Sequence, residues 1–508
     1  MKRQRLHESG GRESHRQFRL IAPILAGLLL CSTAASGDTV YWIGGGGTND
    51  KWSEASNWYA RSPGPADYAF FNATDAGNIN IVDTDLTIGL LRYLGDGVHT
   101  MDLAGSSNLQ VVDGPVQIGW PGANNGAAVT WTNGGSVTVG TPTTARAINI
   151  GYNNQAGVSN TSSLTVNGVR VNAYGDATNS GGIALGANYA AGGASGTLTL
   201  GPGSQFNAGT PAAPVRPGLT IGYNNGLAGS GAGSVDTSGG RADIHVDTLY
   251  VGNNLNGSPT AAGTAAGTLT MGEGTTLTAS TAYISRGNGT TGTTNMNGGL
   301  FAANVATVGS GGTFNFAGGR LAVNDFYTLG NVGTLEQKGG TLAPGFDLAD
   351  RSRTSLAGTS IVHGNYQLGA PGMLEIELFG TTAGSGYDQL RVLGQVGLGS
   401  GSLDVKLGFE SQIGDQFTII DNDQTDAITG RFAGLSELGT LDESYLDYTY
   451  KFEVSYAGGT GNDVTLKVVD KTGSDNPPQP AVVPAPGALL LGAFGVGLLP
   501  WLRRRRLL

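Results

Sequence analysis

A short apolar strand that ends in glycine recurs through the middle of the chain. In the five clear copies, successive glycines are 32, 35, 36 and 30 residues apart. These copies end at Gly119, Gly151, Gly186, Gly222 and Gly252. A period of this length is typical of solenoid proteins, because one repeat is too small to bury its own apolar face and must stack on the next. The repeat therefore restricts the chain to stacked, nearly equivalent coils.

Each repeat contains two further apolar pieces with strand periodicity. Residues 196–200 read Gly-Thr-Leu-Thr-Leu, so that Leu198 and Leu200 face one side and the two threonines face the other. Glycine and β-branched residues dominate, and both disfavour helix. We therefore expect an all-β fold, a right-handed parallel β-helix with one repeat per coil over residues 100–345. A C-terminal β-rich cap and a single C-terminal hydrophobic helix complete the expected fold.

Asparagine pairs follow several of the glycine-ended strands. They are Asn153-Asn154, Asn224-Asn225 and Asn253-Asn254. If the repeats stack, the side-chain amides at one turn lie above one another and form a hydrogen-bonded ladder. A simpler interpretation is that asparagine tolerates the left-handed backbone of a turn. The two interpretations are compatible, and neither makes a binding site.

The segment before the repeats, residues 37–99, is rich in aromatic side chains. Its tryptophans Trp42, Trp52 and Trp58 lie close together in the sequence. A solenoid needs an atypical first coil to cover its open end, and we favour this capping interpretation. The alternative is a glycan-binding site in which exposed indole rings stack on sugars.

The glycine-rich pattern changes after the repeats. Residues 346–470 contain several apolar segments of period two, which predict a C-terminal β region. Residues 459–463 read Gly-Thr-Gly-Asn-Asp, but one copy lacks the tandem ligands of calcium-binding repeats. We predict a tight turn before a final strand there, and neither a metal site nor a cofactor. Residues 471–483, with three prolines, predict a stiff polar linker.

The first 36 residues have the parts of a secretory signal peptide. Six basic residues lie in the first 19 positions, an apolar run follows, and small residues precede Gly37. Cys31 is the only cysteine, so removal of residues 1–36 would leave a chain without thiols. Disulfides and cysteine-bound metals are then excluded. The sequence predicts export.

Residues 484–508 combine a proline-containing motif, an apolar run and four arginines. The run from Ala488 to Leu502 is short for a full membrane span, which needs roughly 17–25 residues. Trp501 and the arginines beyond it are nevertheless typical of the cytoplasmic end of a span. These membrane-retention charges are Arg503, Arg504, Arg505 and Arg506. We expect this segment to anchor the chain transiently in the inner membrane.

This ending resembles the PEP-CTERM sorting signal of Gram-negative bacteria in its motif, apolar helix and basic tail. The motif residues are Val483, Pro484, Ala485, Pro486, Gly487 and Ala488. The family usually has glutamate between the prolines, where this chain has alanine. The resemblance implies an exosortase-like membrane transpeptidase as partner, which would cut near the prolines and leave the body secreted, at the cell surface or in the outer membrane. The alternative is an ordinary anchor that is never cut.

The repeat region is similar to autotransporter passenger domains and to the Gly/Thr-rich β-helical adhesins that often precede such tails. This resemblance implies a structural or adhesive role near extracellular polysaccharide, as in a biofilm matrix. The charge excludes one class of partner. Without the six basic residues of the leader and the four terminal arginines, 18 basic residues remain against 36 acidic ones in residues 37–502. Such an acidic excess argues against nucleic-acid binding.

A polysaccharide lyase or hydrolase is the main alternative, because parallel β-helices also carry such enzymes. Their chemistry needs carboxylates and bases clustered on successive coils. The best candidates are Asp243, His245 and Asp247, which face the same side of one expected strand. No carboxylate or arginine of a neighbouring coil is expected in register with them. We therefore expect no catalytic residues and a structural or adhesive protein, with a glycan-binding module as the third hypothesis.

Overall fold

The computed structural model describes residues 37–473 with several short gaps. The gaps are residues 45–49, 73–78, 95–96, 120–125, 176–181, 211–215, 226–227, 256–262, 330–332, 348, 350–356 and 423–425. The expected signal peptide, most of the linker, the sorting motif, the four arginines and the C-terminal hydrophobic helix lie outside the described residues. Within them, no helix is long and apolar enough to cross a membrane. Their regular structure is nearly all β, with one short 3-10 helix, η1 (Ala55–Asn57).

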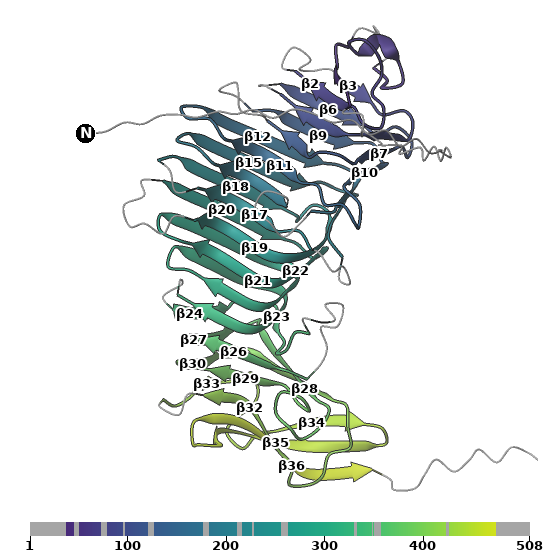
Figure 1. Cartoon of the computed structure of the whole chain (residues 1–508). Helices are drawn as coiled ribbons and strands as arrows, with labels where there is room; N and C mark the ends of the chain where they lie inside the picture. The colour runs from purple at the N-terminus through teal and green to yellow at the C-terminus, as the bar shows by residue number, and fades with distance from the viewer. Residues whose placement is uncertain are drawn as a thin grey trace, which may run out of the picture. The chain divides into compact units, whose positions relative to one another are not determined.

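The chain visits three columns of parallel strands in turn, and one visit to each column makes a coil (Figure 1). Column A consists of β1 (Thr39–Tyr41), β2 (Tyr68–Phe71), β5 (Leu90–Tyr93), β8 (Val116–Ile118), β11 (Ile148–Asn153), β14 (Ile183–Asn188), β17 (Leu219–Asn224), the ends of β19 (Arg241–Asn254), β21 (Thr275–Arg286), β22 (Thr290–Val308) and β23 (Gly312–Thr328), and then β26 (Thr359–His363), β29 (Gln389–Val392) and β32 (Gln416–Asn422).

Column B and column C are built in the same way. Column B consists of β3 (Ile79–Ile81), β6 (Val98–Asp102), β9 (Ala128–Thr132), β12 (Ser159–Val166), β15 (Gly193–Leu200), β18 (Ser230–Asp236), β20 (Thr264–Met271), the starts of β22 and β23, β24 (Thr334–Gln337), β27 (Asn365–Gly369), β30 (Val396–Gly399) and β33 (Thr429–Arg431). Column C consists of β4 (Leu86–Ile88), β7 (Asn108–Val111), β10 (Ser136–Val139), β13 (Arg170–Ala173), β16 (Gln205–Ala208), the starts of β19 and β21, the middles of β22 and β23, β25 (Thr341–Leu342), β28 (Met373–Leu378) and β31 (Ser402–Leu407).

Equivalent apolar residues of neighbouring coils lie directly above one another. One such row in column B contains Leu164, Leu198, Val235 and Leu269. All four are at most 2% exposed. The residue that follows each of them on its own strand is less buried and faces outward. A slip of one residue would turn the whole row toward solvent, so burial fixes the register. The prediction of stacked parallel strands with period two is confirmed. In Figure 1 the successive column B strands β12, β15, β18 and β20 follow one another.

The repeat glycines lie where columns A and B approach closely. The sequence predicted that each glycine ends its strand, but β11, β14, β17 and β19 continue past theirs, and only β8 ends at its glycine. The five predicted copies all have φ between +63° and +77°. A Cβ atom on Gly222 would lie 1.8 Å from the carbonyl oxygen of Ala266 in column B. A Cβ atom on Gly233 would lie 2.2 Å from the backbone nitrogen of Gly222. Neither position can carry a side chain without a backbone shift, so the two columns pack backbone against backbone.

The parallel ladder continues past both ends of residues 100–345. Before them β1 pairs with β2, and after them β30 pairs with β33, again in parallel. These outer coils lack the glycine-ended signature but keep the alternation of buried and exposed residues, as in β2 and β27. Alternation is enough for a strand to join the ladder, so residues 37–99 and the first part of 346–470 belong to the same stack.

The stack ends in an antiparallel sheet (Figure 1). The added strands are β34 (Thr440–Tyr445), β35 (Tyr448–Gly458) and β36 (Asp463–Gly473). β36 pairs antiparallel with β32 of column A and with β35, which in turn pairs with β34. A parallel ladder leaves an open strand edge that invites further pairing, and this sheet occupies the edge of β32.

β36 begins after a tight turn at the Gly-Thr-Gly-Asn-Asp segment. The carboxylate of Asp463 accepts hydrogen bonds from the backbone nitrogens of Thr460 and Asn422, each at 2.9 Å. The carboxylate therefore stabilises the turn and ties it to β32. β36 also contains the first three residues of the expected linker, 471–473.

Candidate functional site

The three tryptophans of the N-terminal segment are buried. Trp42, Trp52 and Trp58 are 1–2% exposed, and their rings surround Phe71 at centroid distances of 5.5–5.7 Å. Trp52 donates a hydrogen bond from Nε1 to Asn80 Oδ1 at 2.9 Å. Ring faces that pack on one another cannot stack on a sugar, so the structure contradicts the glycan-binding hypothesis for these residues. The first coils need bulky rings to fill their interior at protein packing density.

His99 belongs to the same aromatic cluster. Its ring is 1% exposed and lies 5.2 Å from Tyr93 and 6.2 Å from Phe71. Neither ring nitrogen has a hydrogen-bond partner among the described residues. Burial lowers the pKa of His99 to about 4, so the imidazole is neutral at physiological pH. His99 is a core residue without solvent access, and it is no candidate for acid–base chemistry.

The predicted asparagine ladder is confirmed in the middle coils. Asn153 Nδ2 donates to Asn188 Oδ1 at 3.1 Å, and Asn188 Nδ2 donates to Asn224 Oδ1 at 2.9 Å. All three side chains are fully buried. The register continues to Asn254 in the next coil. Because the ladder lies inside the stack, it satisfies buried amides and offers no surface to a ligand.

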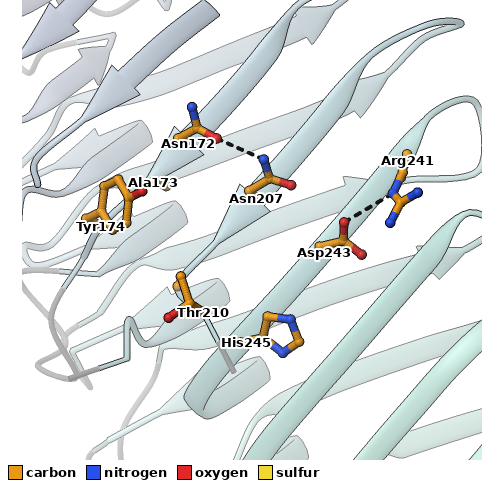
Figure 2. Close-up of a pocket in the computed structure, with 9 residues that line it drawn as sticks. Asn172, Ala173, Tyr174, Asn207, Thr210, Arg241, Asp243 and His245 are labelled. Carbon is orange, nitrogen blue, oxygen red and sulfur yellow. Dashed lines mark hydrogen bonds and ion pairs between the residues drawn. The ribbon is translucent and has the colours of Figure 1, made fainter. Parts of the chain in front are cut away.

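A polar pocket of about 420 Å³ opens on the outer face of column C. Its floor is formed by Asn172, Asn207 and Asp243, which lie in register on β13, β16 and β19. Figure 2 shows these side chains on successive strands, with Tyr174 and Thr210 beside them. Tyr174 and Thr210 follow the ends of β13 and β16, where the chain leaves column C for column A. The chain thus forms both the floor and one side of the pocket.

Hydrogen bonds fix the amides of the floor. Asn207 Nδ2 donates to Asn172 Oδ1 at 2.8 Å, and Asn172 Nδ2 donates to Thr138 Oγ1 at 3.2 Å. Gln205 Nε2 donates to Asn207 Oδ1 at 3.1 Å. A carboxamide has two N–H donors and two acceptor lone pairs. Each half-buried asparagine therefore keeps hydrogen-bonding capacity for a ligand while its orientation is held.

The last strand of the floor carries a charge pair. Arg241 Nε lies 3.1 Å from Asp243 Oδ2, and the two side chains are 66% and 26% exposed. An exposed pair of this kind contributes at most about 1 kcal/mol to stability. Its chemical effect is to orient the carboxylate and to place a guanidinium at the rim of the pocket (Figure 2).

The structure brings two of the three predicted acid–base candidates together. Asp243 and His245 both line the pocket, and His245 Nδ1 lies 2.8 Å from Thr278 Oγ1. Asp247 is not among the lining residues, and its Oδ1 accepts a hydrogen bond from Ser280 Oγ at 2.9 Å. The neighbouring strands place an asparagine and a threonine opposite Asp243, as expected. The described lining residues can hydrogen-bond a hydroxyl-rich ligand through neutral, cationic and anionic groups.

Sequence reasoning missed the asparagines of the floor. Asn172, Asn207 and Asp243 are 35 and 36 residues apart. The column A glycines Gly151, Gly186 and Gly222 have the same two spacings, so a second, polar row with the period of the repeat was present in the sequence. Asparagine does not ionise, and a neutral residue gives no sign of acid–base chemistry in a sequence. Arg241 was overlooked because the expected partner was sought on another coil, whereas it lies two residues away on the same strand.

A carboxyl with a perturbed pKa lies in the C-terminal coils. Asp388 is 1% exposed and burial raises its pKa to about 8. Its two oxygens accept hydrogen bonds from the backbone nitrogens of Gly358 and Glu377, at 2.8 and 2.9 Å. Asp388 therefore fastens two backbone segments to each other, which is a structural role.

Among the described residues, no group of three or more His, Cys, Asp or Glu side chains could hold a metal ion. Comparisons of the chain with protein-family models, with curated proteins and with solved structures found no match. The family resemblance therefore stays a prediction.

Proposed function

We propose that this chain is an exported structural and adhesive protein of a bacterial cell surface, built as a right-handed parallel β-helix and associated with extracellular polysaccharide. The observation that carries the proposal is the continuous parallel register of the three columns from the first coil to the last. In such a stack each coil contacts only its neighbours, so the body extends by repetition and presents the same outer faces again and again. Repeated faces suit attachment and mechanical roles.

Two features of the body support a role outside the cell. Internal amide ladders and backbone pairing stabilise the coils without disulfides, which a chain lacking its leader could not form. The antiparallel sheet also occupies a strand edge that would otherwise recruit other chains, which keeps the body from aggregating.

The proposed route to the surface uses both ends of the chain. Export through the leader would be followed by cleavage near the motif by an exosortase-like enzyme. Mass spectrometry of the mature C-terminus in the native host tests this step, with the expected product ending before Arg503. A Pro484→Ala/Pro486→Ala variant should keep its tail. A wild-type chain that is intact through Leu508 would rule out cleavage and leave the interpretation of the segment as an ordinary membrane anchor.

The second candidate is a β-helical polysaccharide lyase or hydrolase, because Asp243 and His245 share a pocket. The described lining residues contain one carboxylate, whereas glycoside hydrolysis generally uses two. This count supports binding over catalysis. Incubation of the chain and its Asp243→Asn variant with polysaccharides tests it. Release of unsaturated or reducing sugars by the wild type alone would establish the enzyme.

A further inference from the structure

We propose that the polar pocket of column C binds a neutral polysaccharide chain that crosses successive coils, with Asn172, Asn207 and Asp243 as its main contacts. The assignment is argued from the shape of the pocket, from the register of these three residues and from the charges around them. It rests on the proposed function only for the source of the polysaccharide. No residue of the N-terminal tryptophan cluster takes part.

The floor presents the hydrogen-bonding groups that sugar hydroxyls require. Asn172 and Asn207 each keep one N–H donor and one acceptor lone pair beyond the hydrogen bonds that they make within the floor. Asp243 uses Oδ2 for Arg241, and its carboxylate can accept from a hydroxyl group. Adjacent hydroxyls of a pyranose ring act as donor and acceptor at once, so they match this mixture better than a ligand that only accepts. Tyr174 adds an aromatic ring at the side of the pocket.

The floor repeats with the period of the coils. Neighbouring strands of a sheet are about 4.8 Å apart, which is comparable with the length of one sugar residue in a chain. Asn172, Asn207 and Asp243 are in exact register across three coils. A polysaccharide lying across the strands would therefore meet a polar group at each of these three coils, whereas a single small sugar would contact only one or two of them.

The amides are held before any ligand arrives. Each is tied to its neighbour within the row, and Asn207 is also tied to Gln205. Side chains that are already ordered lose little conformational entropy on binding, which favours affinity.

The charges select a neutral polymer. Arg241 at the rim is paired with Asp243, so the pocket offers a polyanion no unpaired charge at that position. The exported body carries 36 acidic against 18 basic residues, and this excess repels anionic chains. Neutral hexose polymers meet no such penalty.

Other aromatic rows on the molecule are less suited to sugars. The rings of Tyr250 and Tyr283 stack on each other at 5.4 Å with an angle of 9° between their planes, and Arg286 covers Tyr283 at 4.8 Å. Their ring faces are thus occupied by neighbouring side chains. The pocket of column C is the better candidate because its polar atoms face outward.

Affinity electrophoresis of the purified full chain tests the proposal. The gels contain a neutral glucan, a neutral galactomannan or anionic polygalacturonate. We expect retardation by a neutral polymer and little by the anionic one. Asn207→Ala and Asp243→Ala should each weaken binding about tenfold, as expected for loss of one good hydrogen bond.

Two matched variants control for general damage to the stack. Asn315→Ala removes a half-buried amide whose Nδ2 donates to Asn295 Oδ1 at 2.8 Å on column B, away from the pocket. Asp404→Ala removes a carboxylate paired at 2.9 Å with Lys406, two residues away on column C. Both should bind like the wild type, and thermal unfolding of all four variants shows whether they fold.

Retardation that persists in folded Asn207→Ala and Asp243→Ala variants would overturn the assignment, and so would the absence of retardation by any neutral polymer. Stronger retardation by polygalacturonate would overturn the choice of a neutral ligand. These results do not depend on export or tail cleavage, so the pocket can fail while the proposed surface role stands. The tail cleavage can also fail while the pocket assignment stands, because an uncut tail does not change retardation in the gel.

Discussion

The first coils and the middle coils share one ladder but fill it differently. Around β2 and β5 the interior is filled by rings, with Trp42, Trp52 and Trp58 packed about Phe71. Around β17 and β18 the backbones of columns A and B meet at Gly222 and have no room for a Cβ atom. The parallel register is the same in both regions. The same ladder therefore accommodates a cluster of large rings in one region and a direct backbone contact between columns A and B in another.

This difference predicts how each region responds to substitution. Where backbone meets backbone, any added atom forces a shift of the chain. Where rings fill the space, the loss of one ring leaves a cavity that neighbours fill only partly. Since each coil contacts only its neighbours, both kinds of damage should remain local at first. Hydrogen exchange of individual coils can then report them separately.

The largest effect is expected at the backbone contact. Gly222→Ala should reduce the free energy of unfolding by at least about 4 kcal/mol, because its Cβ would overlap the carbonyl of Ala266. Gly157→Ala is the control, since Gly157 has nearly the same φ, +74°, but nothing within 4 Å of an added Cβ. It should cost only about 1–2 kcal/mol from the left-handed backbone. If chemical denaturation gave the same loss of unfolding free energy for both variants, the positive φ, and not the close approach of the backbones, would be the reason for glycine at position 222.

The tryptophan cluster should give the next largest effect. Trp58→Ala should cost about 3–5 kcal/mol through lost burial and the cavity left behind. Trp58 contacts both other tryptophans at 5.1 Å and donates from Nε1 to the carbonyl of Trp52. The neighbouring Tyr59, 68% exposed, provides the control, and its alanine variant should lie within about 0.5 kcal/mol of the wild type. A mild effect at Trp58 would mean that the first coil is dispensable to the stack.

The sequence predicted the architecture where its signal was periodic. Glycine-ended strands and alternating threonine and leucine indicated stacked parallel strands, and Leu198 lies in such a row. The role of Gly233 could not be predicted in the same way. Glycine recurs in register with it on the neighbouring strands, but the recurrence does not say which backbone each glycine approaches. The outer coils were harder to assign to the ladder, since their rings replace the repeated small residues.

The candidate site was predictable only in part, for a related reason. Asp243 and His245 attracted attention because they ionise, and both line the pocket. Asn172 and Asn207 are neutral and resemble the many other asparagines of a turn-rich chain. Their shared period becomes informative only when the strands are known to be in register. For the tryptophans the sequence favoured a cap over a binding face, but only the structure shows that their rings are buried.

A moderate effect is expected from the asparagine ladder, which supports the narrow coils from inside. Asn188 donates to Asn224 and to the carbonyl of Ala190, and accepts from Asn153. Asn188→Ala removes all three of these buried hydrogen bonds, so it should cost roughly 1–3 kcal/mol. Asn154→Ala is the control because that side chain is exposed. Hydrogen exchange should accelerate only in the coils next to the Asn188 substitution, and unaltered exchange there would contradict a stabilising ladder.

The smallest effect is expected from pH, because only the first coils contain the buried His99. Their stability should therefore depend on pH in a way that the middle coils do not share. The folded pKa of His99, about 4, lies below the ordinary value of 6.5 because burial disfavours the imidazolium. Between these values the unfolded chain binds the additional proton, so His99 withdraws stability as pH falls from 6.5 toward 4. At pH 5.5 the loss should be about 1 kcal/mol relative to pH 7.5. His99→Phe keeps a ring against Tyr93 and Phe71 but cannot titrate, so its N-terminal coils should lose less stability over the same interval. Hydrogen exchange at both pH values, corrected for intrinsic rates, measures the difference. If wild type and variant change in parallel, the closed aromatic interior assigned to the first coils must admit water.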